Sequence, residues 1–250
     1  MIFATMLVMG MILGFAGTGG SGFIIGLLVA VFGVPIHTAL GTSIAAMIFT
    51  TLSGSVSHVR EGNALWKTGC IIGGFGAFGA FAGTFVSRGI EPDILILMTS
   101  GMLLLCGLLI WVRTRMKGVN QKDTTEADFS SRKFWSLAII TGIVTGGLSG
   151  VFGIGATPFI QLALLILFGF SLRQAVGTTM VVILPIAISG SVGFLQAGFM
   201  EWGLFLEVVT GTVIGSYIGA KFTQQAPKLL LRSAMVLTPI SGAIILLLRN

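Results

Sequence analysis

Two glycine-rich stretches that interrupt long apolar segments hold the residues best placed to do chemistry. They are 17–22 (GTGGSG) and 153–158 (GIGATP). Glycine is unfavourable inside a helix, and the backbone N–H and C=O groups that a break releases need partners that lipid cannot supply. Two such breaks therefore predict backbone that is buried in protein or lines a cavity, and hence a binding site.

Each break also has the pattern of a helix start. We expect Ser21 and Thr157 to be N-caps, with Pro158 at the first helical position in the second copy. The first N–H groups of a helix lack intrahelical partners and carry the positive end of the helix dipole. Two such helix starts close together predict a cradle for a small anion that needs no basic side chain.

Hydroxyl and amide side chains near the breaks extend the predicted site. The expected substrate-binding residues are Gly17, Gly19, Gly20, Ser21, Thr42, Ser43, Gly153, Gly155, Thr157, Gln161, Thr178 and Thr179. The alternative for the threonine and serine tracts is helix packing, in which small residues let backbones approach and hydroxyls bond to a carbonyl one turn earlier. The sequence leaves both interpretations open.

Other kinds of chemistry find little support. The first break spells G-x-G-x-x-G, but the dinucleotide motif needs a preceding strand and a βαβ unit, which the sequence lacks. His37 and His58 are 21 residues apart without acidic companions, and Cys70 and Cys106 each stand alone. We therefore expect no enzyme activity, no metal and no cofactor, and we expect both cysteines to be buried packing residues.

Composition places the chain in a membrane. Of its 250 residues 54% are hydrophobic and only 9% are charged, and the mean hydropathy is +1.03. Segments long enough to cross a bilayer lie at 36–58, 66–86, 93–113, 172–196, 202–221 and 228–248, whereas only about 12 apolar residues follow each break. The net charge is +6, and 6 of the 14 lysines and arginines cluster between residues 113 and 133, so the basic charge indicates topology and not nucleic-acid binding.

The two halves of the chain repeat one another. At a spacing of 136 residues, Gly41-Thr42 aligns with Gly177-Thr178, and the stretch 53–56 (SGSV) aligns with an identical stretch at 189–192. Internal duplication of this kind is common in secondary transporters, whose substrate sites lie at the repeat interface. We divide the chain into a first repeat (1–113), a polar linker (114–133) and a second repeat (134–250).

Basic residues predict how the repeats sit in the membrane. If each broken region crosses once, the lysines and arginines divide 9 to 5 between the two sides; if each is a re-entrant hairpin, they divide 12 to 2. The second division fits the cytoplasmic excess of basic residues better. We expect an all-α polytopic protein of the inner membrane with two inverted repeats, each a re-entrant broken helical hairpin plus three transmembrane helices. The linker is then cytoplasmic and both termini lie outside.

These features together resemble the TauE/SafE family of sulfite exporters and related permeases. The resemblance rests on the paired breaks, the duplicated half, and the tract 37–43 (HTALGTS) with its twin 173–179 (RQAVGTT), and it covers nearly the whole chain apart from the linker. It implies transport, most simply export, of small sulfur-containing anions such as sulfite or organosulfonates. The first break departs from the family pattern, in which more glycine and a later proline are common, at Ser21-Gly22.

Coupling and alternative functions stay open. If a proton drives transport, His58 and Glu207 are the candidates, because a titratable group must reach both the site and water; sodium is the other coupling ion. The alternatives are a permease for another small organic or inorganic anion, including thiosulfate uptake, and a membrane assembly protein that transports nothing. The expected partners are therefore a small anion, a coupling ion and the lipid bilayer.

Overall fold

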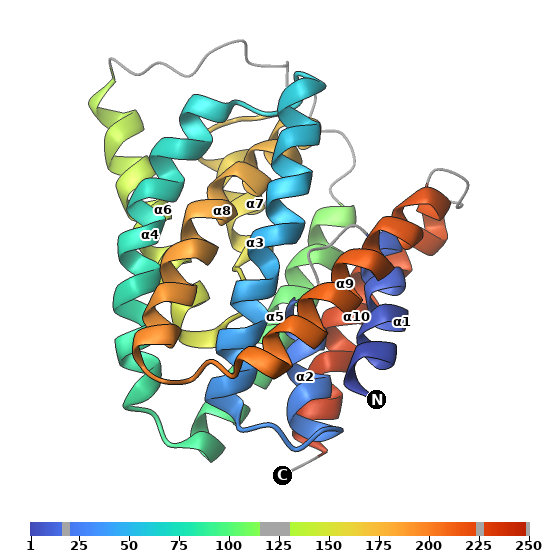
Figure 1. Cartoon of the computed structure of the whole chain (residues 1–250). Coiled ribbons are helices and arrows are strands. Elements are labelled where there is room, and N and C mark those ends of the chain that lie inside the picture. Colours follow the sequence, from blue (N-terminus) through green and yellow to red (C-terminus); the bar gives the residue numbers. More distant parts are fainter. Residues whose placement is uncertain (17–20, 116–130, 224–227, 249–250) are drawn as a thin grey trace.

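The computed structural model describes residues 1–16, 21–115, 131–223 and 228–248. Within these ranges the chain folds into ten helices, and the described residues form no strand (Figure 1). The helices are α1 (Ile2–Ala16), α2 (Ser21–Ala30), α3 (Ile36–Arg60), α4 (Trp66–Arg88), α5 (Pro92–Arg115), α6 (Arg132–Phe152), α7 (Thr157–Ile166), α8 (Leu172–Gln196), α9 (Trp202–Thr223) and α10 (Lys228–Leu247). The prediction of an all-α protein is confirmed.

Five helices in the described part of the chain are long and apolar enough to cross a membrane. These spans are Ile36–Arg60, Trp66–Arg88, Pro92–Val112, Arg132–Phe152 and Arg173–Gln196. The six segments expected from the sequence coincide with α3, α4, α5, α8, α9 and α10, but the described apolar parts of α9 and α10 are shorter. The prediction omits α6, which reaches 21 residues because Ser131 caps its start well before the break.

Helix boundaries recur at the spacing of 136 residues found in the sequence. α2 and α7 each have ten residues, and α3 and α8 each have 25. Gly62 and Gly198 follow α3 and α8 with φ of +70° and +75°. The next residues, Asn63 and Phe199, donate their N–H groups to carbonyls five positions earlier, at 2.9 and 3.1 Å. The left-handed φ favours glycine and ends each helix in the same way.

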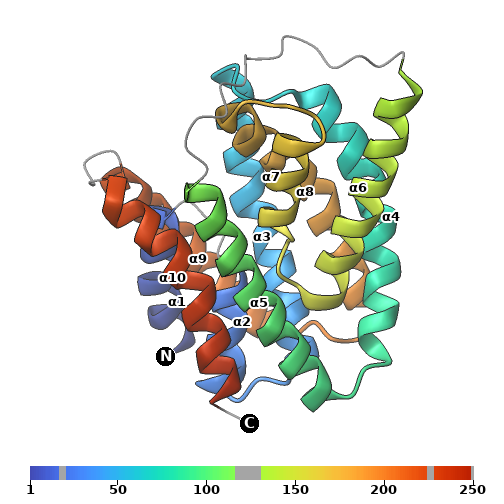
Figure 2. The ribbon, with the colours of Figure 1, turned by 180° about the vertical axis from the view of Figure 1, so that it is seen from behind.

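The long helices end at two opposite faces of the molecule (Figures 1 and 2). The Arg88 end comprises residues 31–41, 86–94 and 194–203, where His37 Nε2 lies 2.9 Å from Ser87 O and its ring stacks on Phe199. The Arg60 end comprises residues 58–67, 131–135 and 167–178, where Leu65 N donates to Thr178 Oγ1 at 3.0 Å. α3 and α8 therefore run in opposite directions.

Two hairpins of unequal helices enter this bundle from opposite ends. Figures 1 and 2 show that α1 starts toward the Arg88 end and α2 returns to it, whereas α6 starts at the Arg60 end and α7 returns there. At 1.5 Å per residue, the ten residues of α2 or α7 rise only about 15 Å. That is roughly half the hydrocarbon thickness of a bilayer, so neither return helix is long enough to span.

Glycines bring α4 against α6 and α1 against α9. A Cβ at Gly146 would overlap the backbone of Gly76, and a Cβ at Gly79 would overlap the carbonyl of Ile143. The second contact recurs between Gly215 of α9 and Leu7 of α1. Small residues allow such close approach in membrane bundles. Each half of the chain thus supplies one helix to each of the two pairs.

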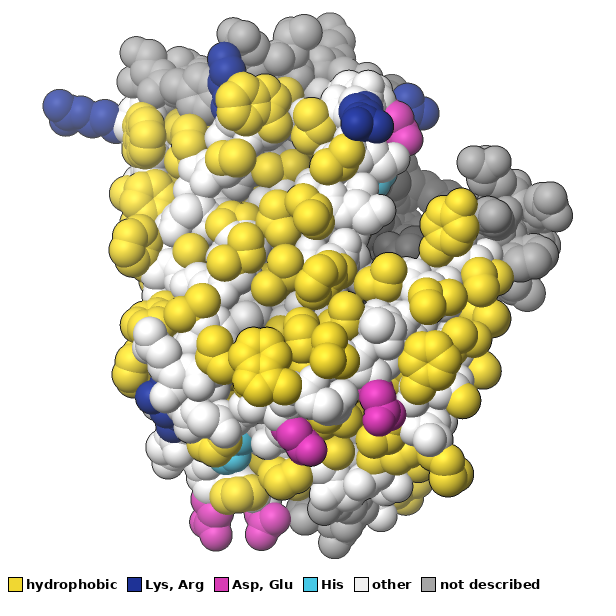
Figure 3. Space-filling view, in the orientation of Figure 1, with side chains coloured by type: hydrophobic (Ala, Val, Ile, Leu, Met, Phe, Trp, Pro, Cys, Tyr) yellow, Lys and Arg dark blue, Asp and Glu magenta, His cyan; other side chains and the backbone are white. Residues whose placement is uncertain are grey.

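The surface is apolar around its middle, and charge lies mainly at the two ends (Figure 3). Phe78 and Leu97 are 76% and 58% exposed, as expected where lipid covers the protein. Among the described side chains, Arg60, Lys67, Arg132, Lys133 and Arg173 lie at the Arg60 end, and Arg88, Glu91, Asp93, Glu201 and Glu207 lie at or near the Arg88 end. The described basic residues are therefore concentrated at one end.

Candidate functional site

The second break turns the chain from α6 into α7 through three residues with left-handed backbone. Gly153, Gly155 and Ala156 have φ of +64°, +68° and +47°. Ala156 is the N-cap of α7 and Thr157 is its first residue, so the prediction of a Thr157 cap is wrong by one residue. The physical reason is that the left-handed residues complete the reversal before Thr157, which leaves it inside the first helical turn.

The first break lies largely outside the described residues, which include none of Gly17, Gly19 and Gly20. α2 begins at Ser21, so this residue is helical, one position later in the helix than the cap expected from the sequence. Ser21 is buried, and its carbonyl accepts a hydrogen bond from Ser43 Oγ at 2.9 Å. The start of α2 is therefore tied to α3.

Both breaks contact one stretch of α3. Ser43 bonds to the start of α2, Leu40 lies 3.0 Å from the Cβ position of Gly153, and Met47 Cε occupies the space that a Cβ at Gly155 would need. Leu40, Ser43 and Met47 follow one another at intervals of three and four residues, so they share a face of the helix. The two breaks thus meet on the same side of α3, between residues 40 and 47.

The hydroxyl groups predicted for the site have different surroundings. Thr179 Oγ1 donates to Ala175 O at 2.6 Å, the bond to the preceding turn that the packing alternative describes, whereas Thr178 Oγ1 accepts from Leu65 N at 3.0 Å. Thr42 is fully buried, and its Oγ1 has no hydrogen-bond partner among the described residues. Of these three hydroxyls, only that of Thr42 makes no hydrogen bond to a described residue.

The remaining predicted residues divide between the interior and the surface. Gln161 is 6% exposed and lies one turn after the half-buried Thr157, so both belong to one face of α7. Glu207 is exposed, and its Oε2 accepts from Phe3 N at 3.3 Å, near the Arg88 end. His58 lies at the Arg60 end of α3, far from Glu207 along the bundle.

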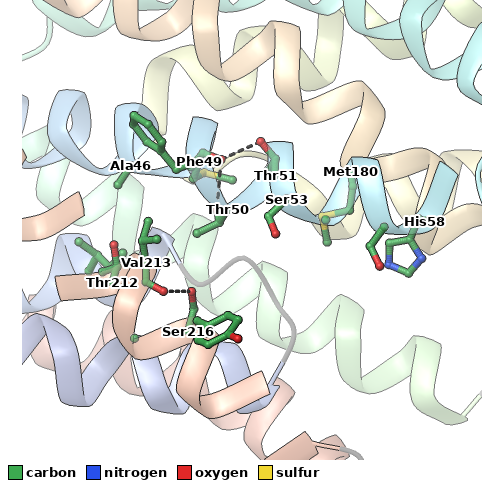
Figure 4. A pocket seen from close by; sticks show the side chains of 16 residues that line it. Ala46, Phe49, Thr50, Thr51, Ser53, His58, Met180, Thr212, Val213 and Ser216 are labelled. Atoms are coloured by element: carbon green, nitrogen blue, oxygen red, sulfur yellow. Dashed lines mark hydrogen bonds between the residues drawn. The ribbon is translucent and has the colours of Figure 1, made fainter. Parts of the chain in front are cut away.

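A cavity of about 450 Å³ lies between α3 and α9 (Figure 4). Its polar lining includes the hydroxyls of Thr50, Ser53 and Ser216 and the imidazole of His58, whose Nδ1 is buried without a partner among the described residues. Its inner part reaches Met47, the residue that contacts the second break. The cavity therefore connects the neighbourhood of the break with the Arg60 end of α3.

Comparison with known proteins assigns the chain to a family. A model of the sulfite exporter TauE/SafE family matches residues 2–246. The chain belongs to this family. The resemblance found in the sequence is confirmed, and with the five apolar spans it makes the protein a multi-pass membrane transporter.

Relatives in the TauE/SafE family carry transporter names without a stated substrate. The chain is 47% identical to "Probable membrane transporter protein YdhB" of Bacillus subtilis (strain 168), over 99% of both chains. It is 26% identical to a "Probable membrane transporter protein" of Xylella fastidiosa (strain 9a5c), over 96% of this chain and 92% of the relative. No solved structure matches the chain.

Apart from His58, sequence reasoning missed the lining of the α3–α9 cavity in this TauE/SafE member. Thr50, Ser53 and Ser57 are spaced by three and four residues, and this pattern is a signal for one polar face of α3. The same pattern also fits hydroxyls that bond within the helix, as Thr50 Oγ1 does to Met47 O at 3.1 Å. Spacing alone could not separate the two cases.

The reactive side chains of the described residues are dispersed. Within the described part of the chain, no three histidine, cysteine or acidic residues gather where they could hold a metal ion. Cys106 is buried as expected, but the expectation for Cys70 is wrong, since it is exposed. The reason is that α4 buries the face carrying Gly69 and Gly73, and Cys70 lies off that face.

Proposed function

We propose that this TauE/SafE member is a secondary transporter that exports small sulfur-containing anions, sulfite or an organosulfonate, across the inner membrane. The observation that carries the proposal is the meeting of both helix breaks on residues 40–47 of α3. Broken helices that meet near the middle of a membrane are where transporters with internal repeats bind their substrates. The family name adds the sulfur-containing class of anion.

The architecture proposed for this function is a pair of inverted repeats with re-entrant hairpins. It is supported by helix ends that recur at 136 residues, by the opposite directions of α3 and α8, and by hairpins that enter from opposite ends. The excess of basic side chains at the Arg60 end supports a cytoplasmic location for that end and for the linker. Both termini then lie outside.

In the proposed site, the anion lies between the two breaks and is held without a basic side chain. The positive end of the α7 dipole supplies about half a unit of charge, and that of α2 supplies the same. The buried Thr42 hydroxyl, which lacks a partner among the described residues, is proposed as a further side-chain donor. Ser43, Gln161 and Thr157 complete the proposed polar surface, together with the glycines of both breaks.

Coupling to a proton is proposed to involve His58. Its imidazole lines the cavity that leads toward the second break, whereas Glu207 bonds to the start of α1 at the other end of the molecule. A titratable group that borders both water and the pathway can carry the proton. A sodium gradient is the alternative driving force.

The test is anion flux in sealed vesicles that contain the purified protein. Radiolabelled sulfite, methanesulfonate, thiosulfate and a carboxylate of similar size are compared, with protein-free vesicles as the control. We expect flux of sulfite or the sulfonate to exceed that of the carboxylate at least tenfold. Preference for thiosulfate, or for the carboxylate, assigns the protein to another anion. Folded protein that moves none of the four contradicts transport and favours an assembly role.

A further inference from the structure

Two helix pairs that are equivalent in the repeats differ in how closely they pack. The spacing of 136 residues relates α4 to α9 and α8 to α3, so the α4–α8 seam and the α9–α3 seam are counterparts. The part of the α4–α8 seam near Arg88 lies toward the Arg88 end. The equivalent part of the α3–α9 seam, near His58, lies toward the Arg60 end. The α4–α8 seam is closed, whereas the α3–α9 seam encloses the 450 Å³ cavity.

Hydrogen bonds and glycine contacts close the α4–α8 seam. Ser189 Oγ donates to Ala77 O at 2.7 Å, and Arg88 Nη2 donates to Gly193 O at 2.6 Å. A Cβ at Gly76 would lie 2.6 Å from the side chain of Ile186. No space for a ligand remains between helices that approach so closely.

The counterpart residues of the α3–α9 seam face the cavity. Ser53 and Val213 correspond to Ser189 and Ala77, and both line the cavity. The carbonyl of Val213 accepts instead from Ser216 of its own helix, at 3.0 Å. The hydrogen bond that joins one pair of helices is therefore absent between the described atoms of the other pair.

The cavity extends along α3 from the second break toward the Arg60 end. It runs from Met47 to His58, about 16 Å of helix at 1.5 Å per residue. A shallower groove of about 580 Å³ continues from Ser53 and Ser57 to Arg60 and Glu61. These two spaces form a route between the break and one face of the molecule.

Side-chain sizes leave room for the α3–α9 seam to close. In the closed seam, glycines of α4 receive larger side chains of α8, as Gly73 receives Pro185. In the open seam the small side chains lie on α3, at Ser53 and Ser57, and they line the same cavity as Val213 and Tyr217 of α9, which are 37% and 67% exposed. The larger side chains of the open seam are therefore on α9, and those of the closed seam are on α8.

From these contacts we propose that the α3–α9 cavity is the chamber through which a small anion passes between the Arg60 end and the helix breaks. The α4–α8 seam is the closed counterpart that leads to the Arg88 end, and the two seams exchange states. When α9 closes on α3, Ser53 Oγ donates to Val213 O and Ser189 releases Ala77. The inference rests on the transport function proposed above.

Engineered disulfides test the exchange. In a Cys70→Ser, Cys106→Ser background, one variant carries Ala77→Cys with Ser189→Cys and the other carries Ser53→Cys with Val213→Cys. We expect both pairs to bridge under mild oxidation, because each seam closes in one state. Each bridge should reduce flux of radiolabelled sulfite at least tenfold, and a reductant should restore it. The four single-cysteine variants are the controls.

Some outcomes would overturn the exchange. Full sulfite flux with the 77–189 bridge in place, or a 53–213 pair that never bridges, would make the α4–α8 seam fixed packing. If the unbridged protein moves no anion, the proposed transport function fails, but bridging of both pairs still reports exchange of the seams. The two failures are thus distinguished by separate readouts, flux and bridge formation.

Thiol labelling tests the chamber itself. Ser57→Cys should react with a charged, membrane-impermeant thiol reagent added at the Arg60 side only. Ile140→Cys, on the exposed apolar face of α6, is the control that the reagent should not reach. Equal reaction of Ser57→Cys and Ile140→Cys, or reaction from the Arg88 side, would contradict a chamber open to the Arg60 end.

Discussion

Thr42 and Thr178 occupy equivalent positions in the two halves, but among the described residues only Thr178 has a partner. Thr178→Val leaves the N–H of Leu65 without its acceptor, so we expect a loss of about 1–3 kcal/mol in stability. Thr42→Val removes a buried hydroxyl that bonds to no described atom, so stability should be unchanged or higher. If Thr42 contacts the anion, that variant should weaken anion binding about tenfold, measured by flux against concentration. Unaltered binding would exclude Thr42 from the site.

Alanine substitutions at Gly155, in the second break, and at Gly169, outside it, distinguish the effect of backbone strain from that of crowding. Their φ values are +68° and +69°, so alanine costs about 1–2 kcal/mol of backbone strain at either position. Only at Gly155 does the new Cβ also meet a side chain, that of Met47; nothing lies within 4 Å at Gly169. We expect similar losses of thermal stability, but loss of flux per folded protein for Gly155→Ala alone. Equal flux in both variants would argue against a narrow site at the break.

His58 and Glu207 give opposite expectations for pH dependence. If transport is proton-coupled through the cavity, His58→Asn should flatten the pH profile of flux. Glu207→Gln removes the charge that accepts from Phe3 N and should leave that profile unchanged. The measurement is initial flux in vesicles at a series of pH values. A profile flattened by Glu207→Gln alone would move the coupling to the Arg88 end.

At the scale of helices, the crossing of α4 and α6 depends on glycine. A Cβ at Gly150 would overlap the carbonyl of Ala80, whereas nothing lies within 4 Å of one at Gly74. Gly150→Ala should therefore separate the helices and lower the unfolding temperature, measured with purified protein in detergent. Gly74→Ala should be neutral or stabilising, because alanine favours the helix by up to about 1 kcal/mol. Equal unfolding temperatures would contradict the packing of this crossing.

Helices were more predictable from the sequence than the contacts of individual side chains. Apolar length and the 136-residue repeat place the helices well, since both depend on backbone preferences that are local. The Thr157 cap was missed because the left-handed Ala156 depends on how the whole break folds. The roles of Thr42 and Thr178 could not be separated either, because the difference is a single contact with Leu65, 113 residues away.

At the scale of the whole molecule, charge predicts the orientation in the membrane. Asp93→Cys and Glu201→Cys, at the Arg88 end, should react with an impermeant thiol reagent from outside the cell. Glu61→Cys and Lys133→Cys, at the Arg60 end, should react only after the membrane is opened. All four positions are exposed, so accessibility depends on the side of the membrane and not on burial. Labelling of all four from one side would contradict the inverted arrangement.

The cavity between α3 and α9 marks where sequence reasoning reaches its limit for the whole molecule. The repeat predicts that the α4–α8 and α3–α9 seams are equivalent, and it cannot say that one is closed while the other is open. The difference belongs to one conformational state of the molecule. The same sequence also encodes the state in which the other seam is closed. The open seam is visible only in the packing of Ser53, Val213 and their neighbours.

Each half of the chain packs one of its helices against a helix of the other half, and this has a consequence for synthesis. α1 leaves the ribosome first, yet its glycine partner α9 begins at Trp202, roughly 190 residues after α1 ends. At about 5–20 residues per second, α1 waits some 10–40 s for the helix that it packs against. During this interval the nascent first half lacks a native neighbour for Gly10, so the insertion machinery or a chaperone must shelter that helix until translation is nearly complete.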